Sequence, residues 1–276
     1  MAASPEIGLS IKAGGIETNY HEQGEGQPLV LFHGSGPGVS AFANWRLVIP
    51  ALSESFRVIA PDMVGFGYTE KPEGQQYNME AWLAHALGIF DALNIEKAHV
   101  IGNSFGGALS LALAIHAPER VDRLVLMGSV GLDFELTEGL DKTWGYTPSF
   151  ENMKELLDIF AYDRSLVTDE LAELRYQASM REGVQEAYAS MFPAPRQDGI
   201  HGMASSEDDI ARIEHETLII HGLEDEVIPV SCSERLLRLI QNSQLHVFRK
   251  CGHWTQIEHN ARFIQLTENF LKEDDA

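Results

Sequence analysis

With 276 residues, 44% of them hydrophobic and 22% charged, the chain can bury one large core and carry a modest insertion. Its formal net charge of -21 would repel a phosphate backbone or an anionic membrane, so we expect no nucleic-acid or membrane partner. An anionic substrate would need a local cationic anchor against this background charge.

The cysteine content and the first residues favour a reducing compartment. Cys232 and Cys251 are the only cysteines, and no Cys-x-x-Cys pair occurs. The sequence does not begin with a basic region followed by an apolar stretch, and no apolar run approaches membrane-spanning length. We therefore expect a cytoplasmic protein.

Strands and helices are expected to alternate along the chain. Residues 7–11 and 16–21 predict a hairpin. Continuous apolar runs predict strands buried on both faces at residues 28–33, 56–60, 98–102, 123–127 and 217–221. Apolar residues recur at helical spacing over 79–93, 105–116 and 231–240, and a last strand and a last helix are expected at 245–248 and 259–271. This order predicts an α/β protein with a mostly parallel, doubly wound sheet.

Residues 133–209 interrupt this alternation. They lack strand-like runs and show helical periodicity over 153–160, 169–180 and 184–191. We expect residues 1–132 and 210–276 to form one core domain, and residues 133–209 to form a helical lid inserted between two core strands.

The strongest local signal is the sequence Gly102-Asn103-Ser104-Phe105-Gly106, between an expected strand and an expected helix. A serine on such a sharp turn needs small residues two positions before and after it, because neighbouring backbone comes too close for side chains. This context is typical of the nucleophile turn of the α/β-hydrolase fold. We predict that Ser104 is the nucleophile; the alternative is a tight glycine-rich turn without catalytic function.

Ser104 needs a base, and the base needs an acid to orient it. Asp225 follows the expected strand 217–221, and His253 follows the expected strand 245–248, which gives the chain order Ser, Asp, His expected for this fold. Glu224 and Glu226 are alternative acids, which we interpret as solvated loop charges, and His33 and His221 are alternative bases. Only His253 of the three histidines follows the acid.

An acyl-type reaction also needs donors for a developing oxyanion. The sequence His33-Gly-Ser35-Gly-Pro-Gly follows the first buried strand, and its glycines would leave backbone N–H groups free. We assign the N–H groups of Ser35 and Phe105 as the donor pair, with a non-catalytic turn as the alternative. No Lys-Ser or Lys-Thr follows, which excludes a Walker-type phosphate loop, and we expect His33 to be structural.

Six segments together resemble the meta-cleavage-product hydrolases of aromatic catabolism, a family of the α/β-hydrolase superfamily: HGSGPG, PDMVGFGYTEKP, GNSFGGALSLALA, MFPAPRQ, TLIIHGLEDEVIP and LHVFRKCGHWTQIEH. The resemblance extends over nearly the whole chain. Within the family, it is greatest to the 2-hydroxymuconic semialdehyde hydrolases, which act on products of single-ring catechols.

The resemblance implies hydrolysis of a carbon–carbon bond in a 2-hydroxy-6-oxohexa-2,4-dienoate. The products would be 2-hydroxypenta-2,4-dienoate and a small carboxylic acid. The substrate would first ketonise, Ser104 would attack the C6 carbonyl, and water would release the acyl group. No cofactor and no metal is implied, and a homo-oligomer, a dimer or larger, is expected.

The same resemblance assigns a residue to each part of the substrate. Arg181 would hold the substrate carboxylate, because a guanidinium can form two parallel hydrogen bonds with it. The residues expected around the substrate are Gly36, Asn44, Asn103 and Trp254, with Trp144 of the lid facing the acyl pocket. The side chain of Phe105 would narrow that pocket. Residues 198–202 depart from the tryptophan-containing helix of the family.

Two other functions remain as alternatives. A carboxylesterase or lactonase could use the same three residues and would not need a cation for a carboxylate. A receptor-like protein with this fold could bind a small ligand without turnover, although an intact triad argues against it. Epoxide hydrolases and dehalogenases are disfavoured, because their nucleophile is a carboxylate.

Overall fold

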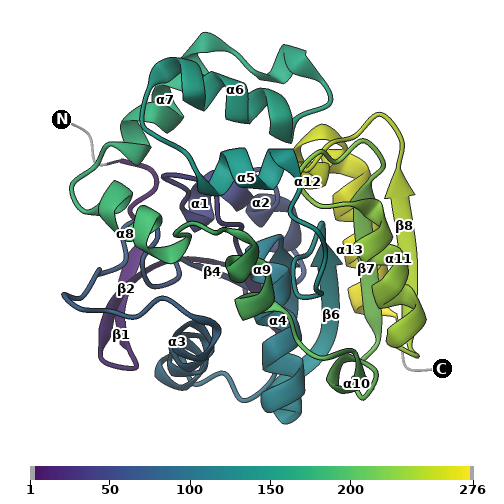
Figure 1. Ribbon diagram of the computed structural model, residues 1–276. Helices are drawn as coiled ribbons and strands as arrows, with labels where there is room; N and C mark the ends of the chain where they lie inside the picture. The colour runs from purple at the N-terminus through teal and green to yellow at the C-terminus, as the bar shows by residue number, and fades with distance from the viewer. Residues whose placement is uncertain (1–3, 274–276) are drawn as a thin grey trace.

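A sheet of eight strands crosses the structure, a computed structural model that describes residues 4–273 (Figure 1). The strand order is β1-β2-β4-β3-β5-β6-β7-β8. The bounds are β1 (Leu9–Ala13), β2 (Ile16–Gln23), β3 (Pro28–Phe32), β4 (Arg57–Pro61), β5 (Ala98–Asn103), β6 (Val121–Met127), β7 (Thr217–Gly222) and β8 (Ser243–Phe248). β2 pairs antiparallel with both β1 and β4. All the other neighbouring strands, β4-β3-β5-β6-β7-β8, pair parallel. The predicted α/β-hydrolase fold is confirmed.

Helices cover both faces of the sheet, and alternate residues of each strand point to opposite faces. Val30 and Phe32 of β3 pack in one hydrophobic cluster with α3 (Met79–Ala92), α4 (Phe105–His116) and α11 (Val230–Leu239). Leu29 and Leu31 pack in a second cluster on the other face, with α1 (Ala41–Trp45), α2 (Ile49–Leu52) and α13 (Asn260–Lys272). Burial on both faces explains why these strands have continuous apolar sequences.

Between β6 and β7, the chain forms helices and no strand within the described residues. These are α5 (Glu138–Trp144), α6 (Phe150–Phe160), α7 (Asp169–Ser179), α8 (Val184–Met191), α9 (Gln197–Met203) and α10 (Glu207–Ile210). We call α5 to α8 the cap helices; Figure 1 shows α5, α6 and α7 stacked at the top of the view. α9 and α10 lie lower, beside α4 and at the foot of α11. The division into core and lid domains stays a prediction.

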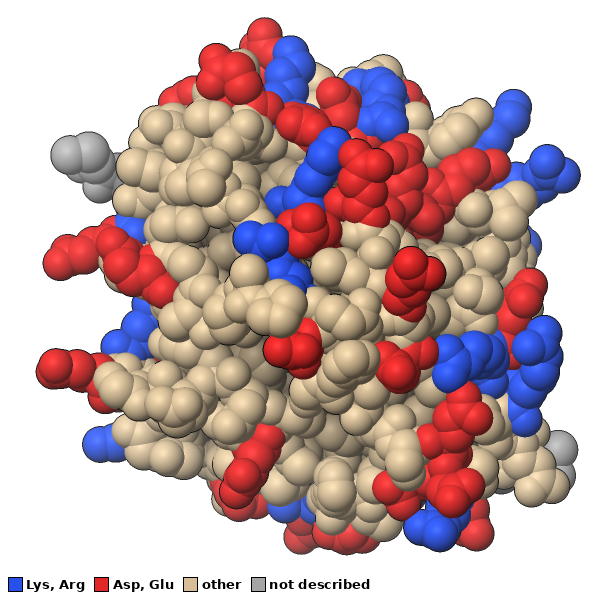
Figure 2. Space-filling view, viewed as in Figure 1, with Lys and Arg blue, Asp and Glu red and all other residues tan. Residues whose placement is uncertain are grey.

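Most cap helices begin at a side chain that accepts a backbone hydrogen bond. Thr137, Ser149 and Thr168 accept from the N–H three residues later, at the starts of α5, α6 and α7. Acidic side chains lie over this region at the top of Figure 2, with basic ones between them. No helix within residues 4–273 is both long and apolar enough to cross a membrane.

Candidate active site

Ser104 occupies the sharp turn between β5 and α4. Its backbone has φ 54° and ψ -113°, a conformation that L-residues rarely adopt outside functional sites. The glycines around it have no room for a side chain: a Cβ on Gly102 would lie 2.2 Å from the Gly106 carbonyl oxygen, and one on Gly106 would lie 2.3 Å from the Phe32 carbonyl oxygen. The expected nucleophile turn is therefore present, and it points Ser104 toward the cap.

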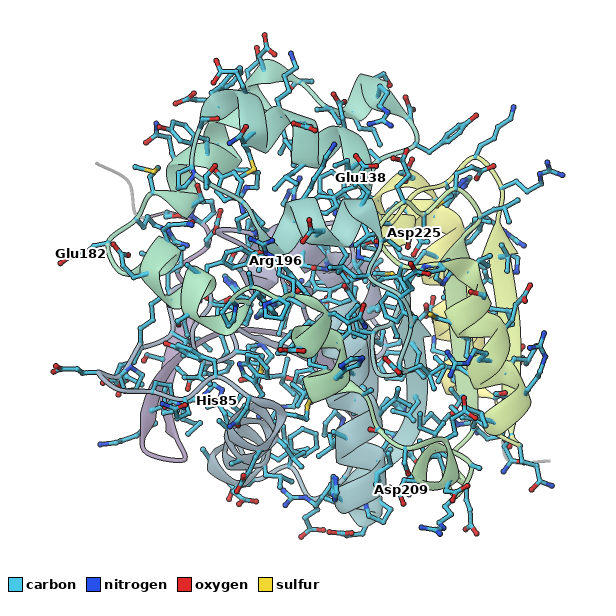
Figure 3. All side chains as sticks on the ribbon, viewed as in Figure 1. His85, Glu138, Glu182, Arg196, Asp209 and Asp225 are labelled. Atoms are coloured by element: carbon cyan, nitrogen blue, oxygen red, sulfur yellow. The ribbon has the colours of Figure 1, made fainter. Side chains whose placement is uncertain are left out.

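The loop after β7 holds Asp225 beneath the cap helices, where Figure 3 labels it. Its side chain is 1% exposed, and its Oδ1 accepts hydrogen bonds from the N–H groups of Val227 (2.8 Å) and Ile228 (3.0 Å). Its Oδ2 lies 2.7 Å from His253 Nδ1. Burial raises the pKa of the Asp225 carboxyl, but its charge and hydrogen-bond interactions with His253, together with His221 and the Ile228 N–H, leave this pKa below its ordinary value.

The rival acids have other partners. One carboxylate oxygen of Glu224 accepts from the backbone N–H of Cys251 at 3.0 Å, so Glu224 links the loop of Asp225 to the loop of His253. Glu226 is exposed and lies 3.3 Å from Arg164. Of the three acidic residues in this loop, only Asp225 contacts His253 in the described structure.

The two alternative bases, His33 and His221, are buried and form hydrogen bonds with backbone groups. His33 accepts from the N–H of Met63 at 3.0 Å through Nε2, which leaves Nδ1 to donate to the Gly34 carbonyl at 2.7 Å. His221 bridges Ser233 (2.7 Å) and the Ile228 carbonyl (2.9 Å). Burial lowers the pKa of both histidines, which favours the neutral ring. His253 borders a cavity instead, as a base for Ser104 must.

That cavity has a volume of about 260 Å³ and lies between the sheet edge and the cap helices. Ser104 and His253 both line it, together with Gly34, Ser35 and Gly36 of the loop after β3. Helices α5 and α6 contribute an apolar wall of Leu140, Met153, Leu157 and Phe160. The two arginines of the lining are Arg46, directly after α1, and Arg175 of α7, so one cavity joins an apolar wall to a positively charged one.

Of the residues expected around the substrate, Gly36, Asn44, Asn103 and Trp254 line the cavity. Asn44 Oδ1 accepts from the Gly34 N–H at 3.1 Å, whereas its buried Nδ2 has no hydrogen-bond partner in the described structure. Asn103 Nδ2 lies 3.4 Å from the Met127 carbonyl oxygen. The free Nδ2 of Asn44 is therefore a donor available to a ligand.

The side chains of Trp144 and Phe105 do not match their expected positions. Trp144 stacks on Phe192 at 4.5 Å between ring centroids, and its Nε1 donates to Ser35 Oγ at 3.2 Å; it is not among the residues that line the cavity. The Phe105 ring is fully buried and packs edge-on against Trp82 at 4.7 Å. Phe105 therefore does not narrow the acyl pocket, because its side chain enters the core behind the turn.

Arg181 also lies elsewhere than its expected role requires. α7 ends at Ser179, so Arg181 follows the helix, and its guanidinium carbon lies 3.9 Å from the centre of the Tyr68 ring. Its Nε donates to the Ala178 carbonyl at 3.1 Å. Arg181 is absent from the described lining of the cavity. Stacking on Tyr68 thus holds this cation away from the site, and the assignment of the substrate anchor to Arg181 is not supported.

Two other arginines, which sequence reasoning missed, line the cavity. Arg46 lies directly after α1 at the rim, where the side chain is partly exposed and its Nη1 donates to the Ala43 carbonyl at 2.6 Å. Arg175 extends from α7 and makes an ion pair with Glu6. Gln256 also lines the cavity, and its buried Oε1 has no described hydrogen-bond partner. Only the position of Arg46 next to Asn44 offered a signal in the sequence.

Residues 27–260 match the family described as alpha/beta hydrolase fold. The chain belongs to this family. Among curated members, this hydrolase is 62% identical over 273 residues to a 2-hydroxymuconate semialdehyde hydrolase of Pseudomonas sp. strain CF600, covering 99% of this chain and 96% of the relative. It is 63% identical over 270 residues to a 2-hydroxy-6-oxo-2,4-heptadienoate hydrolase of Pseudomonas putida, covering 98% of each chain.

Solved structures agree with these relatives. A meta-cleavage product hydrolase from Pseudomonas fluorescens IP01, complexed with acetates, superimposes on this hydrolase with a TM-score of 0.98. The two chains are 62% identical, and the match covers 99% of this chain and 100% of the other. The resemblance to the meta-cleavage product hydrolases that the sequence predicted is confirmed.

Proposed function

We propose that this hydrolase cleaves the carbon–carbon bond of 2-hydroxy-6-oxohexa-2,4-dienoates, with 2-hydroxymuconic semialdehyde and its 6-methyl analogue as substrates. The observation that supports this most is that Ser104 and His253 line the same cavity as two arginines. A serine hydrolase for neutral esters has no need of such cations, whereas a dienoate must place its carboxylate against one. The relatives named for these two substrates share more than 60% of their residues with this chain.

Ser104, Asp225 and His253 would act as nucleophile, orienting acid and base. Because His253 Nδ1 faces Asp225, Nε2 remains to accept the proton from Ser104 Oγ during attack on the C6 carbonyl. The substrate would first ketonise, which moves the C2 hydroxyl proton to C5. After attack, the C5–C6 bond breaks, its electron pair is delocalised into a dienolate, and this fragment takes up the proton that His253 accepted from Ser104. Water next releases the acyl group from Ser104 with His253 again as base.

The N–H groups of Ser35 and Phe105 are proposed as the oxyanion donors. Phe105 is the first residue of α4, and the first N–H groups of a helix have no acceptor within the helix. Ser35 lines the same cavity as Ser104, from the loop on the neighbouring strand β3. The side-chain contact from Trp144 to Ser35 Oγ fixes this loop against the cap.

We assign the substrate carboxylate to Arg175 and Arg46 in place of Arg181. The acyl group would occupy the apolar wall formed by α5 and α6. A cavity of about 260 Å³ favours small acyl groups, because the dienoate and the acyl group must share it. Hydrogen or methyl at C6 should therefore be preferred over phenyl.

The test follows the loss of dienoate absorbance with hydrogen, methyl and phenyl at C6. We expect turnover of the first two, with kcat/KM for the phenyl substrate lower by about tenfold or more. Hydrolysis of neutral aryl esters without any turnover of dienoates would reject the proposal in favour of a carboxylesterase. Binding without multiple turnover would favour a receptor-like function.

A cytoplasmic location and self-association also remain proposals. The composition supports the first, since the chain has two buried, free cysteines and no disulfide-type spacing. Light scattering coupled to size-exclusion chromatography tests the second, and a monomeric mass at micromolar concentration would reject it.

A further inference from the structure

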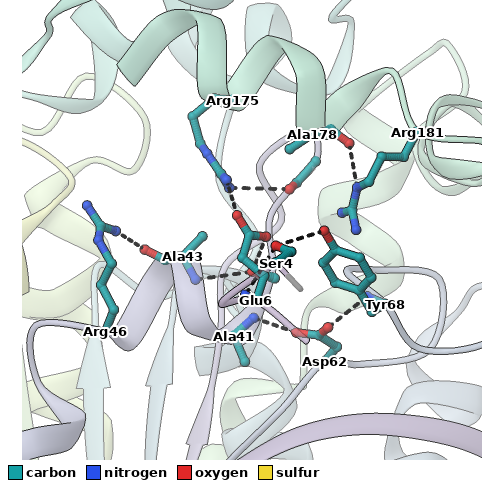
Figure 4. A network of polar contacts seen from close by, with 12 residues as sticks. Ser4, Glu6, Ala41, Ala43, Arg46, Asp62, Tyr68, Arg175, Ala178 and Arg181 are labelled. Atoms are coloured by element: carbon teal, nitrogen blue, oxygen red, sulfur yellow. Dashed lines mark hydrogen bonds and ion pairs between the residues drawn. The ribbon is translucent and has the colours of Figure 1, made fainter. Parts of the chain in front are cut away.

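Glu6 is a buried carboxylate at the boundary between the cap helices and the core, with 7% of its surface exposed. It precedes β1, far from the triad in sequence. One carboxylate oxygen, Oε1, pairs with Nη2 of Arg175 on α7, and the other, Oε2, accepts from Ser40 Oγ at 2.7 Å (Figure 4). Ser40 caps α1, the helix that contributes Asn44 and Arg46 to the cavity.

The three charged groups influence one another. Burial lowers the pKa of the Arg46 guanidinium, the neighbouring Arg175 lowers this pKa further, and Glu6 partly raises it. Arg46 and Arg175 therefore share one local field with Glu6. Figure 4 shows Glu6 below Arg175, with Arg46 on one side and Arg181 on the other.

The pairing determines the charge that the cavity wall offers to a ligand. Two guanidiniums line the cavity, and one carboxylate directly behind them compensates one. The net charge of the group is the sum of two positive charges and one negative charge, which is one positive charge. Without Glu6, two uncompensated cations would face the same small cavity and would attract a second carboxylate.

We propose that Glu6 is a specificity-determining counter-ion, which limits the anchor of Arg46 and Arg175 to one net positive charge. This charge suits a substrate with one carboxylate and disfavours dicarboxylates. Glu6 acts through Arg175, so it is a positioning residue and not a catalytic one. The inference rests on the proposed function in one respect: it assumes that these two arginines hold a carboxylate.

Glu6→Gln tests the role of the charge, because glutamine keeps the size of glutamate and its oxygen can still accept from Arg175, while its NH₂ group can donate to Ser40 Oγ and the side chain carries no charge. The probes are butyrate and succinate, four-carbon acids with one and two carboxylates, as competitive inhibitors of neutral-ester hydrolysis. A competitive inhibition constant does not depend on the turnover rate, so a variant with a generally lower activity can still be compared with the wild type. Glu6→Gln should lower the inhibition constant about 3-fold for butyrate and about 10-fold for succinate at low ionic strength.

The matched control is Glu182→Gln, which changes the net charge of the chain equally but removes an exposed carboxylate after α7. It should shift neither constant. Arg46→Gln changes an exposed residue and leaves the buried pair intact, so it tests the charge count even if Glu6→Gln does not fold. It should weaken butyrate inhibition about 3-fold or more.

Unchanged or weaker inhibition in Glu6→Gln would overturn the counter-ion role, as would equal gains for butyrate and succinate. No effect of Arg46→Gln would overturn the charge count. These measurements use only the ester reaction, so they stay separate from the proposed function. Absence of wild-type dienoate turnover would reject that function and leave the inhibitor comparison valid.

Discussion

His253 Nδ1 lies 2.7 Å from Asp225 Oδ2, while Oδ1 of the same carboxylate accepts two backbone N–H groups. These three contacts fix the carboxylate, which in turn fixes the ring of His253. The backbone of His253 is also held, because its N–H donates to the Phe160 carbonyl of the cap at 2.8 Å. His253, the proposed base, is therefore oriented by both the core and the cap.

Asp225→Asn should decrease kcat on the dienoate by roughly ten-thousand-fold while the fold remains intact. The amide can still accept the two backbone N–H groups, but its NH₂ group facing His253 would favour the wrong tautomer of the ring. Steady-state kinetics with circular dichroism of the same sample provide the measurement. A rate within about tenfold of wild type would move the orienting acid elsewhere, with Glu224→Gln tested next.

Arg175→Ala should lower kcat/KM for the dienoate by at least about 10- to 150-fold, because it removes a charge-assisted hydrogen bond of roughly 1.5–3 kcal/mol and leaves the buried Glu6 carboxylate without its partner. Hydrolysis of 4-nitrophenyl acetate provides the reference, since this ester has no carboxylate. Lysine at position 175 should restore the dienoate reaction only in part, because a point charge cannot reproduce the guanidinium fork. Arg181→Ala is the matched control and should change the dienoate-to-ester ratio by less than about threefold. A larger effect at Arg181 than at Arg175 would restore the original assignment.

His85 on α3, labelled in Figure 3, should make the folded state less stable in mild acid. Burial, with repulsion from His33, lowers the pKa of His85 to about 4, against roughly 6.5 in an unfolded chain. Between these two values the unfolded state binds a proton that the folded state does not, so stability falls as the pH is lowered through this range. Nδ1 accepts from the Val64 N–H at 3.1 Å, and protonation would remove this bond.

The measurement is the free energy of unfolding in urea at pH 7.5 and pH 5. In His85→Gln, the decrease in the free energy of unfolding from pH 7.5 to pH 5 should be smaller than in the wild type by about 2 kcal/mol. The exposed His116→Gln is the control and should match the wild type. Identical acid sensitivity in wild type and His85→Gln would contradict the neutral, buried state of His85.

Two glycine substitutions should have opposite effects on stability. Gly102→Ala would place a Cβ 2.2 Å from the Gly106 carbonyl oxygen, so it should destabilise the fold by about 1–3 kcal/mol and distort the Ser104 turn. Gly202→Ala in α9 meets no atom within 4 Å and should stabilise by about 0.5–1 kcal/mol. Thermal melts of the two variants provide the test, and a tolerated Gly102→Ala would mean that the turn has more room than the structure indicates.

The sequence predicted the sheet and the sharp turn at Ser104 because each depends on local pattern, whereas the catalytic roles of Ser104, Asp225 and His253 stay a prediction. Buried parallel strands are continuous apolar runs, and the Ser104 turn requires glycine at two fixed offsets. The observed strands differ from the expected ones mainly at their ends, as β8 does by beginning at Ser243 instead of residue 245. Short helices such as α5 and α9 were missed, because seven residues give too few turns for periodicity.

The anchor could not be predicted, because it depends on how the cap rests on the core. Arg175 and Arg181 are six residues apart, and no local pattern tells which of them faces the cavity. The positions of the two side chains depend on residues distant in sequence: Glu6, before β1, pairs with Arg175, and the Tyr68 ring stacks on Arg181. Gly38 shows how close this packing is, since a Cβ there would lie 2.5 Å from the Ser179 nitrogen.

The most direct test of carbon–carbon hydrolysis by Ser104 is the product analysis of one substrate, the 6-methyl dienoate, with wild type and Ser104→Ala. The wild type should release acetate and 2-hydroxypenta-2,4-dienoate in equal amounts. Ser104→Ala, which removes the nucleophile from a cavity wall and not from the core, should fold normally and lose roughly a million-fold in kcat. A variant that keeps more than about a tenth of the wild-type rate, or a wild type that leaves the carbon–carbon bond intact, would contradict carbon–carbon hydrolysis by a serine nucleophile.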